Sequence, residues 1–178
     1  MNDAAPRAVL LSDYAPYPFR VEAVSLTFRL APSATRVLSA IRFAPNPDAA
    51  PARRMRLDGE GLRLIRASID GAEVAPEVDP AGLSVDVPEG PFLWEAEVEI
   101  DPAANTALEG LYMSKGMYCT QCEAEGFRKI TYYPDRPDVM ARFRVRIESD
   151  APVMLSNGNP AAQGAGFAEW DDPWPKPA

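Results

Sequence analysis

The fold is decided by the stretch Phe92-Leu93-Trp94-Glu95-Ala96-Glu97-Val98-Glu99-Ile100. Apolar side chains occupy every second position, and glutamates fill most of the positions between them. Successive side chains of a β-strand point to opposite faces, so this alternation predicts a strand with one buried face and one acidic face. It is the clearest strand signal in the chain.

Shorter alternating stretches lie on both sides of it. We expect the first two of them to pair as a hairpin. In the fourth, the apolar phase slips between Leu64 and Ile65, which predicts a bulge or a strand that changes its buried face. Asp70-Gly71 is a hairpin turn sequence, since both residues tolerate positive φ. The stretches span residues 24–30, 37–43, 55–57, 62–69, 83–87, 143–147 and 164–170.

Together these stretches predict a mainly β fold with little helix. Short strands separated by Gly, Pro and Asn-Gly turns are typical of an antiparallel β-sandwich or a saddle-like curved sheet, here of about eight or more strands. One helical turn is expected at residues 137–140, with Pro137 at its start. With 178 residues and 47% hydrophobic content, the chain suits a single domain over residues 1–178.

Composition excludes several classes of function. The net charge of -8, with 26 acidic against 18 basic residues, disfavours nucleic acid and anionic membranes, which are bound by clustered Lys and Arg. No apolar run is long enough for a membrane span, and the first residues lack the pattern of a signal peptide. Two cysteines are too few for a disulfide framework, so we expect a cytoplasmic protein.

The sequence contains no histidine. This absence removes the imidazole base, the Ser-His and Cys-His nucleophile pairs and the His-Glu-x-x-His zinc helix. Most hydrolytic mechanisms are therefore closed to this chain alone.

Polar groups concentrate in residues 105–140, a segment expected to form an irregular site loop without strands. Glu109, Glu123 and Glu125 lie there together with Gln121. Two interpretations stay open from the residues alone: a solvated acidic loop, or a cation site in which a carboxylate beside an amide holds an ammonium group by charge-assisted hydrogen bonds.

The same segment holds Cys119-x-x-Cys122. A structural zinc site would need four Cys or His ligands, and a thioredoxin-type pair would need a βαβ context. Two packed thiols are the favoured interpretation. Tyr132 and Tyr133 are expected in the core, and Arg136 is expected to bind the acids of its own loop.

Several runs of this segment and its surroundings resemble one family. They resemble the amino-terminal domain of the bacterial aminopeptidase N family, zinc metallopeptidases of the M1 (gluzincin) type. The resemblance covers the chain from Tyr14 to the end. The runs that carry it are Leu108-Glu109-Gly110-Leu111-Tyr112, Cys119-Thr120-Gln121-Cys122-Glu123-Ala124-Glu125-Gly126-Phe127-Arg128, Ile130-Thr131-Tyr132-Tyr133, Asp135-Arg136-Pro137-Asp138-Val139, Leu155-Ser156-Asn157-Gly158-Asn159 and Trp170-Asp171-Asp172-Pro173-Trp174-Pro175-Lys176-Pro177.

The resemblance implies a β-rich saddle that rests on a catalytic domain absent from this chain. The partners it implies are that domain and peptide N-termini, from which the full-length enzyme removes single residues in peptide catabolism. Zinc is implied in the full-length enzyme, with its ligands outside this chain, so the resemblance implies no catalytic residue and no metal ligand within it. By position, Glu123 anchors the α-ammonium of the substrate and Gln121 lines the pocket for the first side chain. The alternative is a stand-alone β-sandwich interaction module without a peptidase role.

Overall fold

The structure is a computed structural model that describes residues 10–178. Within them the chain forms thirteen strands and two short 3-10 helices, η1 (Leu11–Asp13) and η2 (Phe127–Lys129). The strands are β1 (Phe19–Arg29), β2 (Thr35–Pro45), β3 (Arg54–Asp58), β4 (Arg63–Ile69), β5 (Ala72–Glu73), β6 (Glu77–Asp79), β7 (Gly82–Asp86), β8 (Phe92–Ile100), β9 (Gly110–Ser114), β10 (Met117–Gln121), β11 (Ala141–Glu148), β12 (Asn159–Gly164) and β13 (Phe167–Lys176).

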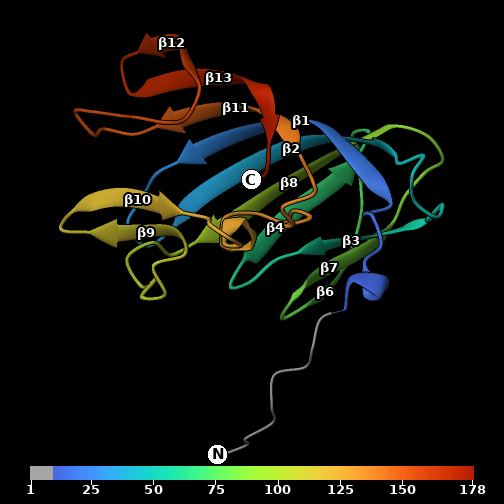
Figure 1. The fold of residues 1–178 in the computed structure, drawn as a ribbon. Helices are drawn as coiled ribbons and strands as arrows, with labels where there is room; N and C mark the ends of the chain where they lie inside the picture. Colours follow the sequence, from blue (N-terminus) through green and yellow to red (C-terminus); the bar gives the residue numbers. More distant parts are fainter. Residues whose placement is uncertain (1–9) are drawn as a thin grey trace, which may run out of the picture.

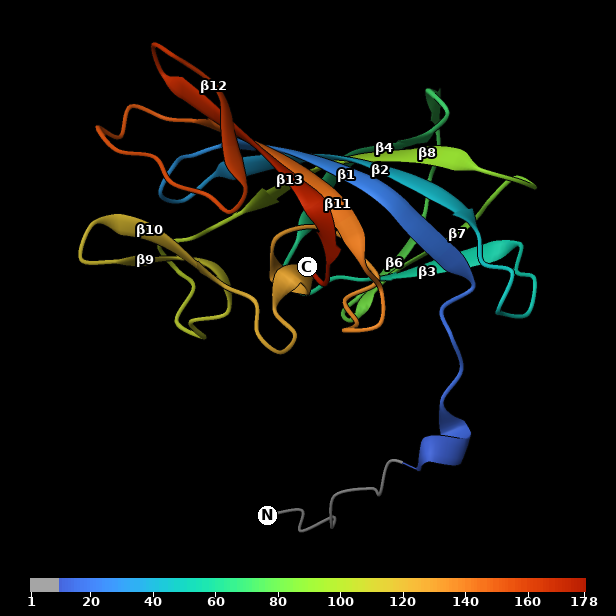
Figure 2. The same ribbon diagram turned by 45° about the horizontal axis from the view of Figure 1, so that its top comes forward.

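Three sheets build the molecule. The largest has eight strands in the order β12-β13-β11-β1-β2-β8-β4-β5, and a small sheet has the order β3-β7-β6. Strands β9 and β10 form a separate hairpin. Figure 2 shows the large sheet as a curved upper layer, with the small sheet and the hairpin below it. The segment that follows β10 lies between these two lower elements (Figures 1 and 2). The predicted curved, mainly β architecture is confirmed.

Strand β8 has the predicted bounds and the predicted faces. From Phe92 onward every second residue is buried and those between are half-buried, and Trp94 and Val98 are fully buried. The ring of Phe92 stacks on Phe43 of the neighbouring β2, with centroids 5.4 Å apart. The acidic positions face away from this core. Strand β8 therefore lies inside the sheet between β2 and β4, and its alternation reflects two different environments.

Arginines on the neighbouring strands bind the outward glutamates of β8. Arg36 of β2 contacts Glu97 and Glu99 at 2.8 and 2.9 Å. On the other side, Arg66 of β4 contacts Glu97 at 3.0 Å, and Arg63 pairs with Glu99. Opposite charges on adjacent strands stabilise a sheet face that is open to solvent.

The turn and bulge predictions are confirmed. Strands β1 and β2 pair antiparallel as a hairpin. The register of β4 against β8 shifts between Leu64 and Arg66, where the apolar phase slips. Asp70 and Gly71 have φ values of 50° and 80° and connect β4 to β5.

Two expectations about strands were wrong. The large sheet is mixed, because β1 pairs with β11 in parallel; a long connection separates them, and alternation carries no information about strand direction. Residues 105–140 do contain strands, since β9 and β10 pair there. At Pro137 the structure has a turn, closed by the Val139 N–H donating to the Arg136 carbonyl at 3.2 Å, and the single helical turn of this region lies at η2.

The last strand also differs from the expectation. Residue Gly164 ends β12, and β13 continues past Trp170 to Lys176 despite two prolines. Strand β12 pairs with β13 only as far as Asp171, so beyond that point one edge of β13 is free and tolerates proline. Trp170 is buried, whereas the side chain of Trp174 is 75% exposed.

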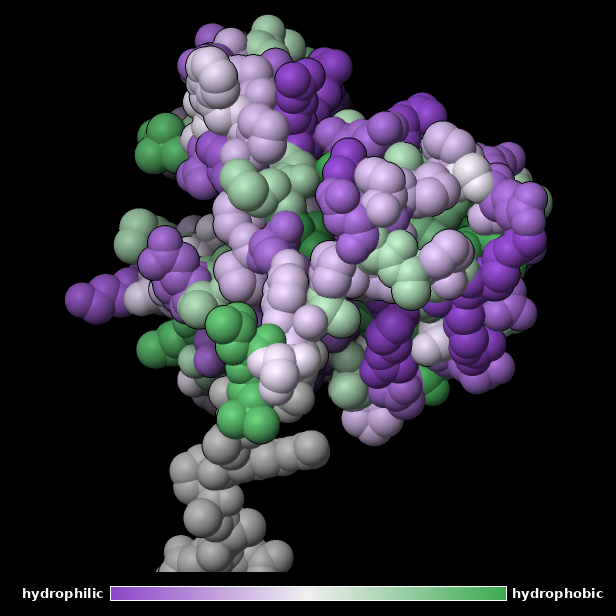
Figure 3. Space-filling view, turned by 45° about the vertical axis from the view of Figure 1, so that its right-hand side comes forward, coloured by the Kyte–Doolittle hydropathy of each residue, from purple (hydrophilic) through white to green (hydrophobic). Residues whose placement is uncertain are grey.

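The main core lies between the two layers. It joins the inward residues of the large sheet to those of the lower layer, including the fully buried Met55, Leu57 and Leu83. In Figure 3, one face of the molecule is mainly hydrophilic, with a hydrophobic patch beside the first described residues, where Leu10 and Leu11 are exposed. None of the helices within residues 10–178 has the length and apolar character to cross a membrane.

Candidate functional site: the loop after strand β10

The β9–β10 hairpin sets the position of Gln121. Its strands pair from Ser114 opposite Met117 to Gly110 opposite Gln121. Lys115 and Gly116 form the turn, with φ values of 50° and 82°. Two positive φ values in a two-residue turn match the twist of the flanking strands. Gln121 therefore lies exposed at the end of β10, where the hairpin meets the following loop.

Gly126 closes the base of this loop. A Cβ at Gly126 would lie 2.8 Å from the carbonyl oxygen of Gln121 and 3.4 Å from the backbone nitrogen of Gly110. Only glycine permits this close approach of backbones. Residues 122–125 consequently form a tight loop beside the hairpin, and Glu123 lies on it. The Gln121 side-chain amide donates a hydrogen bond to the Glu123 carbonyl at 3.2 Å.

The three acids of the predicted cluster have different partners. Glu125 forms an ion pair with Arg128 at 2.7 Å, and Glu109 lies 3.6 Å from the Lys129 ammonium. The Glu123 side chain is exposed, and among residues 10–178 no hydrogen bond or ion pair involves its carboxylate. Of these acids, Glu123 is therefore the one whose charge is available to a ligand.

The short helix η2 anchors the loop to the core. Phe127 is buried, and its ring packs edge-on against Tyr133 with centroids 5.0 Å apart. The carbonyl of Arg128 accepts the Glu60 N–H at 2.9 Å. A few residues further on, Asp58 of β3 and Tyr133 exchange backbone hydrogen bonds of 2.8 and 3.1 Å.

A buried carboxylate completes the anchor. Asp135, with a side chain only 3% exposed, accepts hydrogen bonds from Nε of Arg128 at 2.8 Å and from the Arg128 backbone N–H at 3.1 Å. The backbone N–H of Asp135 donates to the Asp58 carboxylate at 3.0 Å. The contacts that join Asp58, Arg128 and Asp135 were not predicted from the sequence. Asp58 and Asp135 are 77 positions apart, and nothing local marks them as neighbours.

The predictions for Tyr132 and Tyr133 are confirmed, whereas that for Arg136 is confirmed for Asp138 but not for Asp135, which Arg128 binds instead. Both tyrosines are buried in the core. Arg136 pairs with Asp138 at 2.7 Å and also donates to the Ala15 carbonyl at 2.9 Å. These residues therefore hold the loop in place.

The cysteines agree with the packing interpretation. Both are free and half-buried, and Cys122 packs against the core. Burial raises the pKa of the Cys122 thiol to about 11, so it stays protonated at neutral pH and is a poor nucleophile. In the described part of the chain, no three His, Cys, Asp or Glu side chains gather in a way that could hold a metal ion.

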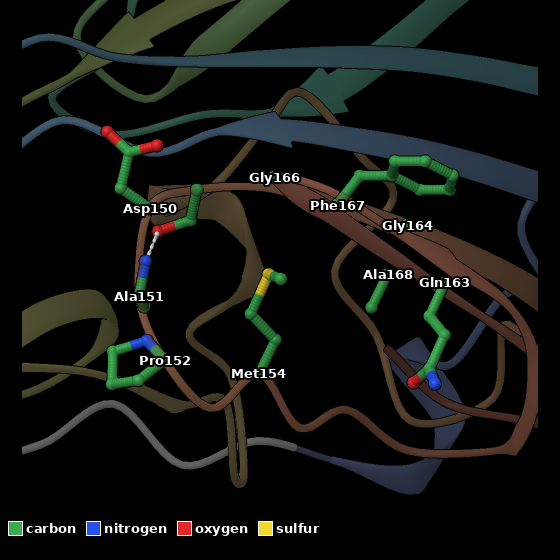
Figure 4. Close-up of a pocket in the computed structure, with 10 residues that line it drawn as sticks. Asp150, Ala151, Pro152, Met154, Gln163, Gly164, Gly166, Phe167 and Ala168 are labelled. Carbon is green, nitrogen blue, oxygen red and sulfur yellow. Dashed lines mark hydrogen bonds between the residues drawn. The ribbon is translucent and has the colours of Figure 1, made fainter.

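A cavity of about 590 Å³ lies elsewhere, between the segment 149–154 and the β12–β13 hairpin. Figure 4 shows the Met154 side chain between Pro152 and Ala168, while the carboxylate of Asp150 points away from it. No residue of the segment 105–140 lines this cavity. It therefore does not include Gln121 or Glu123.

The fold and this loop define a class of protein: a β-rich domain that presents an acidic loop anchored to its core by Phe127 and Asp135. The model of the peptidase M1 N-terminal domain matches residues 80–173, and the chain belongs to that family.

Named relatives agree with this assignment. The chain is 47% identical to aminopeptidase N of Caulobacter vibrioides, a match that covers 100% of the chain and 22% of the relative. It is 43% identical to aminopeptidase N of Escherichia coli, over 97% of the chain and 21% of the relative. The chain thus spans about a fifth of the length of the curated relatives it matches.

Solved structures show the same fold. Aminopeptidase A of Legionella pneumophila, in complex with aspartic acid, superposes with a TM-score of 0.85 at 30% identity, over 94% of this chain and 21% of that one. An M1 zinc metallopeptidase of Deinococcus radiodurans, at 18% identity, shares the fold with a TM-score of 0.77, over 90% of this chain and 40% of that one.

Proposed function

We propose that this chain is the amino-terminal domain of a cytoplasmic M1 zinc aminopeptidase that removes N-terminal amino acids from peptides in peptide catabolism. In this proposal residues 1–178 form one domain. Glu123 binds the α-ammonium of the substrate, and Gln121 lines the pocket for its first side chain. The observation that carries the proposal is the exposed Glu123 carboxylate, which has no partner within residues 10–178, while its neighbours Glu109 and Glu125 are paired.

The chemistry of the ligand follows from the task of an exopeptidase. A carboxylate binds a free ammonium group at a peptide N-terminus but leaves an internal amide without a matching charge. An exposed ion pair contributes only about 0–1 kcal/mol, whereas a hydrogen bond to a charged group shielded from water contributes about 1.5–3 kcal/mol. Selective binding at Glu123 therefore requires a second surface that covers it.

Exposed apolar side chains support the presence of such a surface. Leu108 and Met117 are 57% and 61% exposed on the hairpin side of the loop. Met140 and Trp174 are 51% and 75% exposed at the paired ends of β11 and β13. Large exposed apolar side chains commonly mark surfaces that pack against another domain. A stand-alone interaction module, the alternative, requires no such surface.

Zinc does not fit the residues of this chain. The sequence has no histidine, and residues 10–178 contain no group of acids and thiols arranged for a metal. Glu123 and Gln121 consequently bind and orient the substrate, and in this proposal the zinc ligands belong to the rest of the polypeptide. An open reading frame that continues past Ala178 into a His-Glu-x-x-His segment is expected.

The test is Glu123→Gln in the full-length protein. We expect KM for aminoacyl substrates to rise, or kcat/KM to fall, by about ten- to a hundredfold, which corresponds to the loss of one charge-assisted hydrogen bond. Zinc content, measured by mass spectrometry, should stay unchanged. Glu169→Gln is the matched control and should leave KM unchanged, because it removes a carboxylate of the outer sheet face, which Arg144 binds at 2.8 Å.

Two results would contradict the proposal. One is loss of zinc from Glu123→Gln, which would remove the positioning role. The other is peptidase activity or stoichiometric zinc in the isolated chain, which would show that the catalytic groups are not elsewhere.

A further inference from the structure

Arg128 connects the loop that carries Glu123 to the segment that follows η2. Its Nη2 donates to Glu125 at 2.7 Å on one side and to the Asp135 carbonyl at 3.0 Å on the other. Its Nε and its backbone N–H both donate to the same Asp135 carboxylate oxygen. One planar guanidinium therefore joins the loop before η2 to the segment after it, and a fork of fixed geometry holds both acceptors in defined positions.

The far end of this connection is rigid. The Asp135 carboxylate is buried, and its backbone N–H is bound by Asp58 of β3. Arg128 itself follows Phe127, whose ring is fixed in the core between Tyr133 and Phe143. The Glu125 end is exposed, with a side chain 52% accessible. Asp135 is thus held firmly against β3, and Arg128 restrains the exposed loop by binding Glu125.

The same contact also removes a competitor. Glu123 and Glu125 are two residues apart in one tight loop, and either carboxylate could attract an ammonium group. Arg128 binds the Glu125 carboxylate at 2.7 Å, whereas the Glu123 carboxylate has no partner among the described residues. A free cation consequently meets one available carboxylate in the loop.

We infer that Arg128 is a positioning residue that selects the ammonium-binding carboxylate: it occupies Glu125 and fixes the loop against Asp135, so that Glu123 is the carboxylate of the loop that binds the substrate ammonium. This inference rests on the proposed function. Arg128 touches neither the substrate nor the reacting atoms and acts only through Glu123.

A double-mutant cycle in the full-length protein tests it. The variants are Glu123→Gln, Arg128→Met and the double variant, with KM and kcat measured for an aminoacyl substrate. Arg128→Met should raise KM about tenfold with little change in kcat, the cost of losing one well-placed charged contact. In the Glu123→Gln background, Arg128→Met should change KM by no more than about twofold relative to Glu123→Gln alone, because the effects of coupled residues do not add.

Two further variants guard against loss of folding. Arg128→Lys keeps the charge near Glu125 and Asp135 but loses the fork, and it should recover part of the KM effect. Arg144→Met removes an arginine of the outer sheet face that pairs with Glu169 at 2.8 Å, and its KM should match that of the wild type. Thermal unfolding of each variant reports any global loss of structure.

The outcomes separate the two claims. If Glu123→Gln alone leaves KM unchanged, the proposed function fails. If Glu123→Gln raises KM but the Arg128→Met effect is fully additive to it, Arg128 has a merely structural role and the inference is wrong. An Arg128→Met variant that lowers kcat without affecting KM would equally overturn it.

Discussion

The two carboxylate partners of Arg128 offer a direct comparison of a buried and an exposed ion pair on one cation. The side chain of Asp135 is 3% exposed, and that of Glu125 is 52% exposed. Asp135→Asn and Glu125→Gln each replace a carboxylate by an amide of the same shape. Both keep an acceptor oxygen, so the comparison isolates the negative charge.

The expected magnitudes follow from burial. Removing one partner of a buried pair costs about 3–5 kcal/mol of unfolding free energy. The Arg128 side chain is 26% exposed, so water screens part of its charge, and we expect about 2–3 kcal/mol for Asp135→Asn. For Glu125→Gln we expect at most about 1 kcal/mol, the usual value of an exposed pair.

Urea unfolding of the isolated chain, followed by tryptophan fluorescence, measures both. The midpoint should move while the slope stays constant, because neither change alters the surface exposed on unfolding. In a domain of this size about 1 kcal/mol shifts Tm by roughly 2–4 °C, so Asp135→Asn should lower Tm by about 4–12 °C. If the two variants differ by less than about 0.5 kcal/mol, burial does not decide the strength of these pairs and the reasoning is refuted.

Two further predictions concern packing and pH. Gly82→Ala should destabilise the chain by about 3 kcal/mol or more, because φ is +149° and the new Cβ would lie 2.0 Å from the Leu57 carbonyl oxygen. Gly90→Ala has φ +84° with nothing within 4 Å and should cost only about 1–2 kcal/mol, so equal losses would contradict the packing argument. Burial raises the pKa of the Cys122 thiol from its ordinary 9.0 to about 11. Between pH 9 and 11 the thiol is therefore ionised in the unfolded chain but still protonated in the folded one, so the free energy of unfolding should fall as the pH rises through this range. Denaturation at several pH values should show that the free energy of unfolding declines less steeply with pH in Cys122→Ala than in the wild type. Cys119→Ala is the control for loss of a thiol. If Cys122→Ala declines as steeply as the wild type, the burial of Cys122 does not affect stability.

Strands with strong alternation were predictable from the sequence, and strand direction was not. Strand β8 matches its prediction because each of its faces meets one environment along its whole length. The parallel pairing of β1 with β11 could not be predicted from either sequence, because alternating apolar and polar residues are compatible with both parallel and antiparallel neighbours. The β9–β10 hairpin was missed because its positions range only from buried near Gly110 to exposed near Gln121, without a regular period.

For the candidate site, the sequence identified the residues and the structure distinguished among them. The residue type alone does not distinguish Glu109, Glu123 and Glu125, and Glu123 was chosen because of the resemblance to the aminopeptidase N family. In the structure, Arg128 and Lys129 of η2 contact Glu125 and Glu109, whereas Glu123 has no partner in the part of the chain that the structure describes. The positions of those cations depend on Phe127 entering the core beside Tyr133.

The sequence by itself determined a mainly β domain, the strand built around Trp94, the turn at Asp70-Gly71 and the absence of histidine chemistry. These features depend on side-chain period and residue type, which are local properties. Only the tertiary structure decided the mixed sheet order and the network of Asp58, Arg128 and Asp135. Contacts between residues 77 positions apart form only when the whole core brings two segments together, and no local pattern encodes them.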